Sequence, residues 1–387
     1  MSFLAQRFYI ICFIFMLLLG VNLSVYQSVI IDINSSFNLD GASAGLFVAL
    51  YFLGSLIVPA PAGELSDRVG KKLVLMIACV VFITGIVVVS QATGIIACGT
   101  GILLIGSGSC TIEGLFSAKI TDENPNSSEK LMNFSQLFFC VGAVLGPILA
   151  LSIKSLGADW QSIMLIIAAL FLPAAVSLVL IPGDKKSTDV IGRKSKSYSL
   201  MLLKDIKFLI LFFSMLLYVG AEIGVAFSIT GYYSSTGQAS YTGEIALSLF
   251  WAGMIIGRLV AGVLHKQSDK IMIICLLTGT VFSLLLQFQH QTFISTALFF
   301  LLGLSFSAIW PLLMAFCTQI FKSFSGTAGG LMVVGGSIGG MTFPALMGAV
   351  TGTAGVRAAM VISTCAMAIT MTMYMIGRKI KKKEQAK

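Results

Sequence analysis

Long apolar segments alternate with short polar ones along the whole chain. About 20 consecutive apolar residues form a helix that crosses a hydrocarbon core of roughly 30 Å. Backbone amides find no water in lipid, so spans of this length must be helical, and the alternating pattern of a membrane barrel is absent. The pattern therefore predicts an all-α protein with twelve transmembrane helices. These are expected at residues 8–31, 43–63, 72–91, 94–119, 133–152, 160–182, 207–231, 243–264, 270–288, 292–319, 325–350 and 356–377.

The composition agrees with this pattern. The chain is 57% hydrophobic and 11% charged, with a mean hydropathy of +0.96, whereas soluble domains hold about 45–50% apolar and about 25% charged residues. Segment 8–31 follows Arg7 as in a signal peptide, but it is too long for one and no small-residue cleavage site follows it. We interpret it as the first span, and almost no residues remain for a soluble domain.

The basic residues indicate an orientation. If the N-terminus is cytoplasmic, all but two of the 25 Lys and Arg fall on the cytoplasmic side, the exceptions being Lys154 and Arg357. This distribution obeys the positive-inside rule and predicts a multi-pass protein of a bacterial cytoplasmic (inner) membrane, with both termini cytoplasmic. The net charge of +9 then belongs to loops near anionic lipid, so we expect a lipid bilayer and no nucleic acid as partner.

The chain divides into two halves of six spans, residues 1–182 and 207–387, joined by a basic cytoplasmic linker at 183–206. Gly142-x3-Gly146 in the fifth span has a counterpart in Gly335-x3-Gly339 of the eleventh, 193 residues later. Such spacing predicts pseudo-symmetric parallel repeats. It also lets helix backbones approach closely, and we expect these glycines to serve helix packing.

The most specific feature is the charged segment Gly63-Glu-Leu-Ser-Asp-Arg-Val-Gly-Lys-Lys72, interpreted as a turn between two spans, with a degraded echo at residues 262–270. It resembles the signature loop of the major facilitator superfamily of secondary transporters, between the second and third spans. The resemblance implies the twelve-helix major facilitator fold and a gating role for this segment. Asp67 and Arg68 are expected to dock at the start of the eleventh span, near residues 325–328, where a helix N-terminus favours a carboxylate. The predicted gating residues are Gly63, Asp67, Arg68, Gly70, Lys71 and, in the eighth span, Arg258.

Polar residues inside the spans are the candidates for function, since a charge in a membrane normally faces a cavity or a partner. Glu113 lies in the fourth span and Glu222 in the seventh. Both could instead be paired or protonated groups that hold helices together, and Arg258 could snorkel to the cytoplasmic interface. Uncharged polar candidates in the first and fifth spans are Gln27, Asn133 and Gln136.

A narrower resemblance runs over nearly the whole chain. The segment Asn133-Phe-Ser-Gln136-Leu-Phe-Phe-Cys-Val-Gly142-Ala looks like the fifth span of the fucose:proton symporter family, and Tyr218-Val-Gly-Ala-Glu222 resembles its seventh. Ser307-Ala-Ile-Trp310-Pro311 looks like the tenth. The resemblance implies that Glu113 carries the coupling proton. Gln27, however, stands where that family has an acidic residue, and Ser117 stands where an asparagine is usual.

We therefore expect a monomeric symporter that moves a small polar solute, a sugar or related metabolite, by alternating access coupled to protons or another cation. Gln27, Asn133, Gln136 and Glu222 would hydrogen-bond solute hydroxyls, and Trp251 or Trp310 would offer a ring face.

An exporter of the same fold is the alternative function, although Glu113 has no basic partner nearby in sequence. A membrane sensor is a third possible function. The eight cysteines lie in apolar spans without metal-ligand spacing, so we expect no metal and no cofactor. No Ser-His-Asp or paired-carboxylate arrangement indicates hydrolytic work, so we expect no enzymatic activity.

Overall fold

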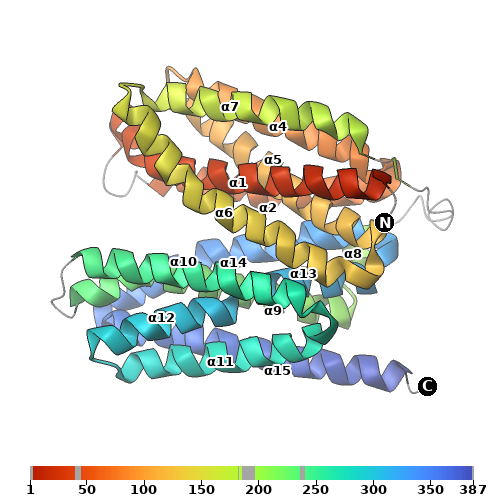
Figure 1. Cartoon of the computed structure of the whole chain (residues 1–387), viewed down its shortest axis with the longest axis vertical. Coiled ribbons are helices and arrows are strands. Elements are labelled where there is room, and N and C mark those ends of the chain that lie inside the picture. Colours follow the sequence, from red (N-terminus) through yellow and green to blue (C-terminus); the bar gives the residue numbers. More distant parts are fainter. Residues whose placement is uncertain (1–2, 40–44, 182, 185–196, 236–239, 386–387) are drawn as a thin grey trace. The chain divides into compact units, whose positions relative to one another are not determined.

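The computed structural model describes residues 3–39, 45–181, 183–184, 197–235 and 240–385. Every regular element among them is helical (Figure 1). Twelve helices or helix pairs are long and apolar enough to cross a membrane, between Arg7 and Lys379. The predicted all-α architecture with twelve spans is confirmed.

The helices follow one another with short connections. Their bounds are α1 Phe3–Ser36, α2 Leu46–Ile57, α3 Pro59–Val69, α4 Lys71–Ser90, α5 Ile95–Glu123, α6 Ser128–Ser155, α7 Trp160–Ser177, α8 Tyr198–Leu202, α9 Ile206–Ser235, α10 Ser240–Val263, α11 Ser268–Phe288, α12 Thr292–Phe306, α13 Ile309–Ile320, α14 Ser325–Ala354 and α15 Val356–Gln385.

The chain packs as two compact units, each described here by itself. The N-terminal unit holds Met1–Leu200 with Thr318–Val334, and the C-terminal unit holds Met201–Cys317 with Gly335–Lys387. The start of α14 therefore belongs to the N-terminal unit. Half of the predicted linker, at 185–196, lies outside the described residues, and its last part contains α8.

Glycines let neighbouring helices approach at the backbone. Within the N-terminal unit α1 lies beside α6 (Figure 1). A Cβ on Gly142 would lie 1.9 Å from the carbonyl oxygen of Leu17, and one on Gly20 would lie 2.0 Å from that of Phe139. In the C-terminal unit a Cβ on Gly339 would lie 2.0 Å from the carbonyl oxygen of Leu216. Any side chain would force these helices apart, so the glycines serve helix packing, as the small-residue spacing indicated.

Two spans are interrupted at proline. The second span is split into α2 and α3, and Pro59 occupies the first position of α3, where a missing N–H costs no hydrogen bond. The tenth span is split into α12 and α13, with Ser307 and Ala308 between them. Pro311 has no N–H to offer the carbonyl of Ser307 four residues earlier. That carbonyl needs a donor from another helix.

The charged segment differs from its prediction as a turn. Residues 63–69 are helical and complete α3, because Glu64 pairs with Arg68 one helical turn later. The reversal is confined to Gly70, whose φ of +105° is a conformation that other residues rarely adopt. The helix therefore fixes the direction in which each charged side chain of the segment points.

Candidate functional site

Asp67 lies at the N-terminus of α14. Its carboxylate accepts the backbone N–H of Gly326 at 2.9 Å, and the backbone N–H and hydroxyl of Thr327, both at 2.7 Å. The first N–H groups of a helix have no intrahelical acceptor and carry about half a positive charge together, so a carboxylate is stabilised there. The sequence analysis expected this docking of Asp67, and the structure shows it.

Lys71 and Gly63 also take part in the contact between α3 and the start of α14. The ammonium of Lys71 lies 3.0 Å from Asp67 and 2.9 Å from Asp122 on α5. Asp122 in turn accepts the hydroxyl of Ser325 at 2.8 Å. A Cβ on Gly63 would lie 2.2 Å from the carbonyl oxygen of Gly326, so only glycine allows α3 to approach α14 this closely. The start of α14 is thus held by a charged network of α3, α4 and α5.

Arg68 takes a different direction. It forms an ion pair with Glu64 at 2.6 Å, and its guanidinium lies 4.8 Å from the ring centre of Tyr198 on α8. Glu64 also accepts the hydroxyls of Ser197 and Ser199 at 2.9 and 2.8 Å. Tyr198 packs on Phe324 with ring centres 4.6 Å apart. Arg68 therefore fastens the short helix α8 to α3, a contact that the sequence analysis did not foresee.

Asp184 holds the ends of α4 and α5. It accepts the ammonium of Lys119 at 2.8 Å and the backbone N–H of Lys72 at 2.9 Å. Lys119 is only 1% exposed and also lies 3.3 Å from Glu123. Burial raises the pKa of Asp184, but the hydrogen bonds from Lys119 and Lys72 outweigh it and the net pKa is lowered. Asp184 is thus a charged partner for a buried lysine.

Glu113 and Gln136 meet inside the N-terminal unit. The amide nitrogen of Gln136 on α6 donates to the carboxylate of Glu113 on α5 at 2.8 Å. Asn133 is fully buried one turn earlier on α6, and its amide nitrogen donates to the carbonyl of Glu129 at 2.8 Å. Among the described residues, the side-chain oxygen of Asn133 has no hydrogen-bond partner. Gln27 on α1 is exposed, and among the described residues no hydrogen bond joins it to Glu113.

The sequence analysis did not predict a second polar group, which lies one helical turn from Glu113. The hydroxyl of Tyr51 on α2 lies 3.1 Å from that of Ser109, one turn before Glu113 on α5. The ring of Tyr26 stacks on that of Tyr51 with centres 5.9 Å apart. Asn22, one turn before Tyr26, is 1% exposed, and neither its amide nitrogen nor its oxygen has a hydrogen-bond partner in the part of the chain that the structure describes. Asn22 and Tyr26 are four residues apart and therefore share one face of α1, and this spacing is the sign of a polar group that the sequence offered.

The polar residues of the C-terminal unit gather at the break between α12 and α13. Tyr218, Glu222 and Arg258 are 0%, 7% and 4% exposed. The Tyr218 hydroxyl donates to the carbonyl of Phe306 at 2.8 Å, and the Nε of Arg258 donates to the carbonyl of Ser307 at 3.2 Å. This second bond supplies the donor that Pro311 cannot give.

The two predicted tryptophans lie apart from this hydrogen-bonded group. Trp251 on α10 is half-buried and packs on Phe250, with ring centres 5.5 Å apart. Trp310 on α13 is also half-buried and lies directly after the break. Neither ring is sealed in the core, so each keeps apolar surface for contact with another molecule or with lipid.

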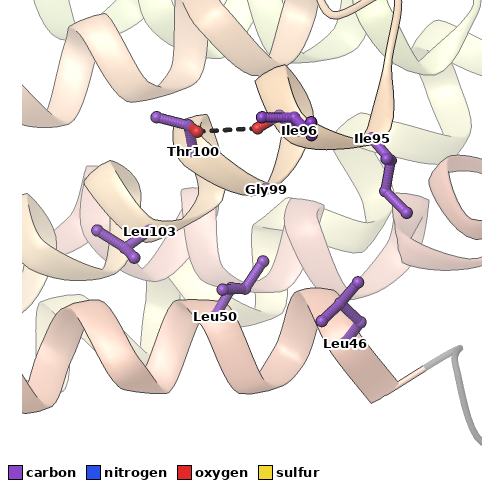
Figure 2. A pocket seen from close by; sticks show the side chains of 7 residues that line it. All are labelled: Leu46, Leu50, Ile95, Ile96, Gly99, Thr100 and Leu103. Carbon is purple, nitrogen blue, oxygen red and sulfur yellow. Dashed lines mark hydrogen bonds between the residues drawn. The ribbon is translucent and has the colours of Figure 1, made fainter.

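An apolar hollow of about 300 Å³ lies between α2 and α5, lined by Leu46, Leu50, Ile95, Ile96, Gly99, Thr100 and Leu103 (Figure 2). Its one side-chain hydroxyl, on Thr100, is already bonded to the carbonyl of Ile96 at 2.8 Å. Ile96 is 82% exposed. The hollow therefore suits an acyl chain and offers no recognition of a polar solute.

Comparison with known proteins shows where the chain belongs. The family model described as Major Facilitator Superfamily matches residues 12–268 and 208–387. The glucose/mannose transporter of Bacillus subtilis is 22% identical over 63% of this chain, and the alignment covers 63% of that transporter, less than two thirds of its length. An inner membrane transport protein of Escherichia coli is 23% identical over 78% of this chain and 70% of its own length.

Solved structures of similar fold cover the chain almost completely. The E. coli fucose:proton symporter has a TM-score of 0.84 and 19% identity, covering 97% of this chain and 99% of its own. A proton:xylose symporter has a TM-score of 0.79 and 17% identity, covering 95% and 94%. At these identities the likeness shows a shared fold.

Proposed function

The chain belongs to the Major Facilitator Superfamily, and on that premise we propose that it is a secondary transporter that moves a small polar solute, a sugar or related metabolite, by alternating access coupled to protons. The names of its relatives support the solute class, since they include a glucose/mannose transporter and symporters of fucose and of xylose with protons. An exporter of the same fold is the alternative.

The hydrogen bond from Gln136 to Glu113 is the observation that carries this proposal. A carboxylate within a span is costly and normally serves an ion or solute pathway. Here the amide of Gln136 donates to the Glu113 carboxylate, and a carboxylate can also take a proton or accept the hydrogen of a solute hydroxyl. We therefore assign the coupling proton to Glu113.

The solute contacts are proposed from hydrogen-bonding capacity. The buried oxygen of Asn133 is an acceptor without a partner among the residues that the structure describes, so it can take a hydroxyl hydrogen. Gln136 and the exposed amide of Gln27 offer further donors. Trp251 and Trp310 would each offer a ring face, and a solute contact by Glu222 remains a prediction.

The contact between Asp67 and α14 supports a gating role for Gly63, Asp67, Gly70 and Lys71, because alternating access requires contacts that form in one state and break in another. We include Arg68 in the gate because its guanidinium packs on Tyr198 of α8. We include Arg258 because it donates to the carbonyl of Ser307 between α12 and α13. We further propose a monomer in a bacterial cytoplasmic membrane with both termini cytoplasmic, following the distribution of basic residues.

A ligand screen tests the function. Purified protein is heated with sugars, polyols, amino acids and lipophilic cations, and a compound that binds the folded state raises the unfolding temperature. At about 100 times its Kd a ligand adds about 2.7 kcal/mol. Each hit is then assayed for uptake into proteoliposomes with and without a pH gradient. A sugar or polyol driven uphill by the gradient supports the proposal. Transport of lipophilic cations alone would establish the exporter.

A further inference from the structure

The hollow between α2 and α5 exists because these two helices diverge toward their N-termini. Where they cross, the backbones touch, since a Cβ on Gly54 would lie 2.1 Å from the carbonyl oxygen of Leu103. One turn earlier on α5, a Cβ on Gly99 would meet only the ends of side chains, the nearest being the Cδ1 of Leu50 at 2.8 Å. A Cβ on Gly94, directly before α5, would have no atom of the described residues within 4 Å. The hollow is therefore the wedge of space between two separating helices.

The hollow has the length of an acyl chain in one leaflet. Its α5 residues are Ile95, Ile96, Gly99, Thr100 and Leu103, which share one face of the helix (Figure 2). From Ile95 to Leu103 the helix rises about 12 Å. One leaflet of the hydrocarbon core is about 15 Å thick, half of the whole core. A chain in the hollow would thus reach from the boundary of the core nearly to its centre.

The hollow opens on a surface that faces lipid. Both of its helices belong to segments that are long and apolar enough to cross a membrane. Leu46 at its mouth is exposed, and Leu53 and Ile57 continue this exposed apolar face along α2. The hydroxyl of Thr100 is already bonded to the carbonyl of Ile96, so the hollow offers no partner that would hold water. An acyl chain would supply the van der Waals contacts that the empty space lacks.

The mouth of the hollow lies at the N-termini of both helices. α2 begins after Gly45 and α5 after Gly94, and among the described residues no side chain caps either helix. The first N–H groups of a helix have no intrahelical acceptor and carry about half a positive charge together. A phosphate oxygen accepts such hydrogens. The charge at the mouth therefore complements the headgroup of a phospholipid and gives a neutral lipid no such contact.

We propose that the hollow binds one acyl chain of a membrane phospholipid, whose phosphate lies at the N-termini of α2 and α5. With both termini cytoplasmic, as proposed above, this lipid belongs to the outer leaflet. The chain keeps the two helices apart beside Leu50, and the next residue, Tyr51, holds the hydroxyl of Ser109. The site is thus a lipid contact next to the polar group of the N-terminal unit, whatever solute is carried.

Photo-crosslinking of the wild-type chain tests the position of the lipid. Delipidated full-length protein in detergent receives one equivalent of a phosphatidylglycerol with a diazirine at the end of one acyl chain. After irradiation we expect crosslinks at Leu50 and Leu103, where the hollow ends. Unlabelled phosphatidylglycerol should suppress them at about one tenth of the concentration that a diacylglycerol with the same chains requires.

Two results of this experiment would overturn the proposal. Crosslinks spread over the exposed apolar residues of α4 and α7, with none at the hollow, would mean that lipid binds only as a general belt around the protein. Equal suppression by the diacylglycerol would mean that no phosphate is recognised at the mouth.

Gly99→Leu provides a variant that fills the hollow with protein atoms. Its side chain meets only the flexible end of Leu50, so the helices can accommodate it. In a titration followed by native mass spectrometry, the first phosphatidylglycerol should bind about tenfold more weakly than to wild type. Ala97→Leu is the matched control, because it adds the same bulk at an exposed position of α5 that does not line the hollow. Binding by Gly99→Leu equal to that of wild type would contradict the proposal.

Unfolding temperatures separate lost binding from lost folding. Without lipid Gly99→Leu should unfold at or above the temperature of wild type, because leucine fills a void. Phosphatidylglycerol should then raise this temperature for wild type and Ala97→Leu and leave it unchanged for Gly99→Leu. If Gly99→Leu is unstable, the crosslinks of the wild-type chain decide the question alone. A dimer that Gly99→Leu abolishes and lipid leaves intact would make the hollow a subunit contact, and the proposal would be wrong. None of these measurements uses a solute, so the proposed transport function stands or falls separately.

Discussion

Thr327 donates twice to one carboxylate oxygen of Asp67, through its backbone N–H and its hydroxyl, each at 2.7 Å. Gly326 donates its backbone N–H to the other oxygen at 2.9 Å, and these two N–H groups, which can only donate, belong to the positive end of α14. An amide at position 67 would present hydrogens to donors. The contact is therefore specific for a carboxylate.

We expect Asp67→Asn to weaken the contact between α3 and α14. Hydrogen bonds to a charged group contribute about 1.5–3 kcal/mol each, so loss of one shifts the balance of states by roughly 10- to 100-fold. The protein should populate the state open to the cytoplasm and turn over more slowly, while expression is retained. Cysteine labelling from the two sides of the membrane would measure the shift.

Asp159→Asn is the control for this variant. Asp159 is exposed at the N-terminus of α7, and its carboxylate accepts the N–H of Ser162 at 2.8 Å. Asparagine caps a helix about as well as aspartate, so transport and labelling should be unchanged. If Asp67→Asn behaved like Asp159→Asn, the contact at α14 would have no gating role.

The second prediction concerns the coupling proton. Glu113→Gln keeps an oxygen that can accept the bond from Gln136, but position 113 no longer titrates. Uphill accumulation driven by a pH gradient should be abolished, at least 100-fold, while counterflow exchange of the same solute stays within about threefold. Transport assays in proteoliposomes measure both rates.

Glu244→Gln tests whether the effect is specific, since Glu244 is an exposed glutamate on α10. Both assays should be unaffected by it. Wild-type accumulation by Glu113→Gln would reduce Glu113 to a helix-packing residue and remove the basis for proton coupling at this position.

The twelve spans were predictable because lipid imposes one length and one backbone solution on every crossing. The helix over residues 63–69 was not predicted, because its charges and Gly63 suggested a turn. In the structure Pro59 starts a helix, and the ion pair between Glu64 and Arg68, four residues apart, lies within its last two turns. Only the left-handed backbone of Gly70 makes the reversal.

The site was predictable as a set of residue types, and its pairings were not. Glu113 was conspicuous as a carboxylate in an apolar span, but its contact with Gln136 depends on how α5 packs on α6. Tyr51 and Ser109 are ordinary residues in a membrane helix, so only the structure shows that they meet one turn from Glu113. Asp184 similarly forms an ion pair with the buried Lys119, 65 residues earlier in the chain, and the sequence does not show this pairing.

A third prediction follows from Asn22. Its buried amide has no hydrogen-bond partner among the described residues, and an unsatisfied buried polar group costs about 1–3 kcal/mol. Asn22→Leu keeps the number of side-chain heavy atoms and the branch at Cγ and removes this cost, so the unfolding temperature in detergent should rise. Asn133→Leu is the comparison, because it breaks the bond to the Glu129 carbonyl and should lower that temperature. A fall in stability for Asn22→Leu would show that the amide is satisfied by bound water.

The last prediction uses the lowered pKa of Asp184. A carboxyl whose pKa is lower in the folded than in the unfolded protein stabilises the fold above its unfolded pKa, about 3.9, and this stabilisation is lost as pH falls through the folded pKa. Asp184→Asn should therefore unfold at a lower temperature than wild type at pH 7, because the buried Lys119 loses a charged partner. The difference should be constant from pH 8 to about pH 5 and shrink below about pH 4.

Asp159→Asn, at an exposed carboxylate whose pKa is lowered by hydrogen bonds from Ser162, has no buried lysine to release and should show a much smaller difference at pH 7. Equal unfolding temperatures for wild type and Asp184→Asn at pH 7 would mean that Lys119 is held by Glu123 alone.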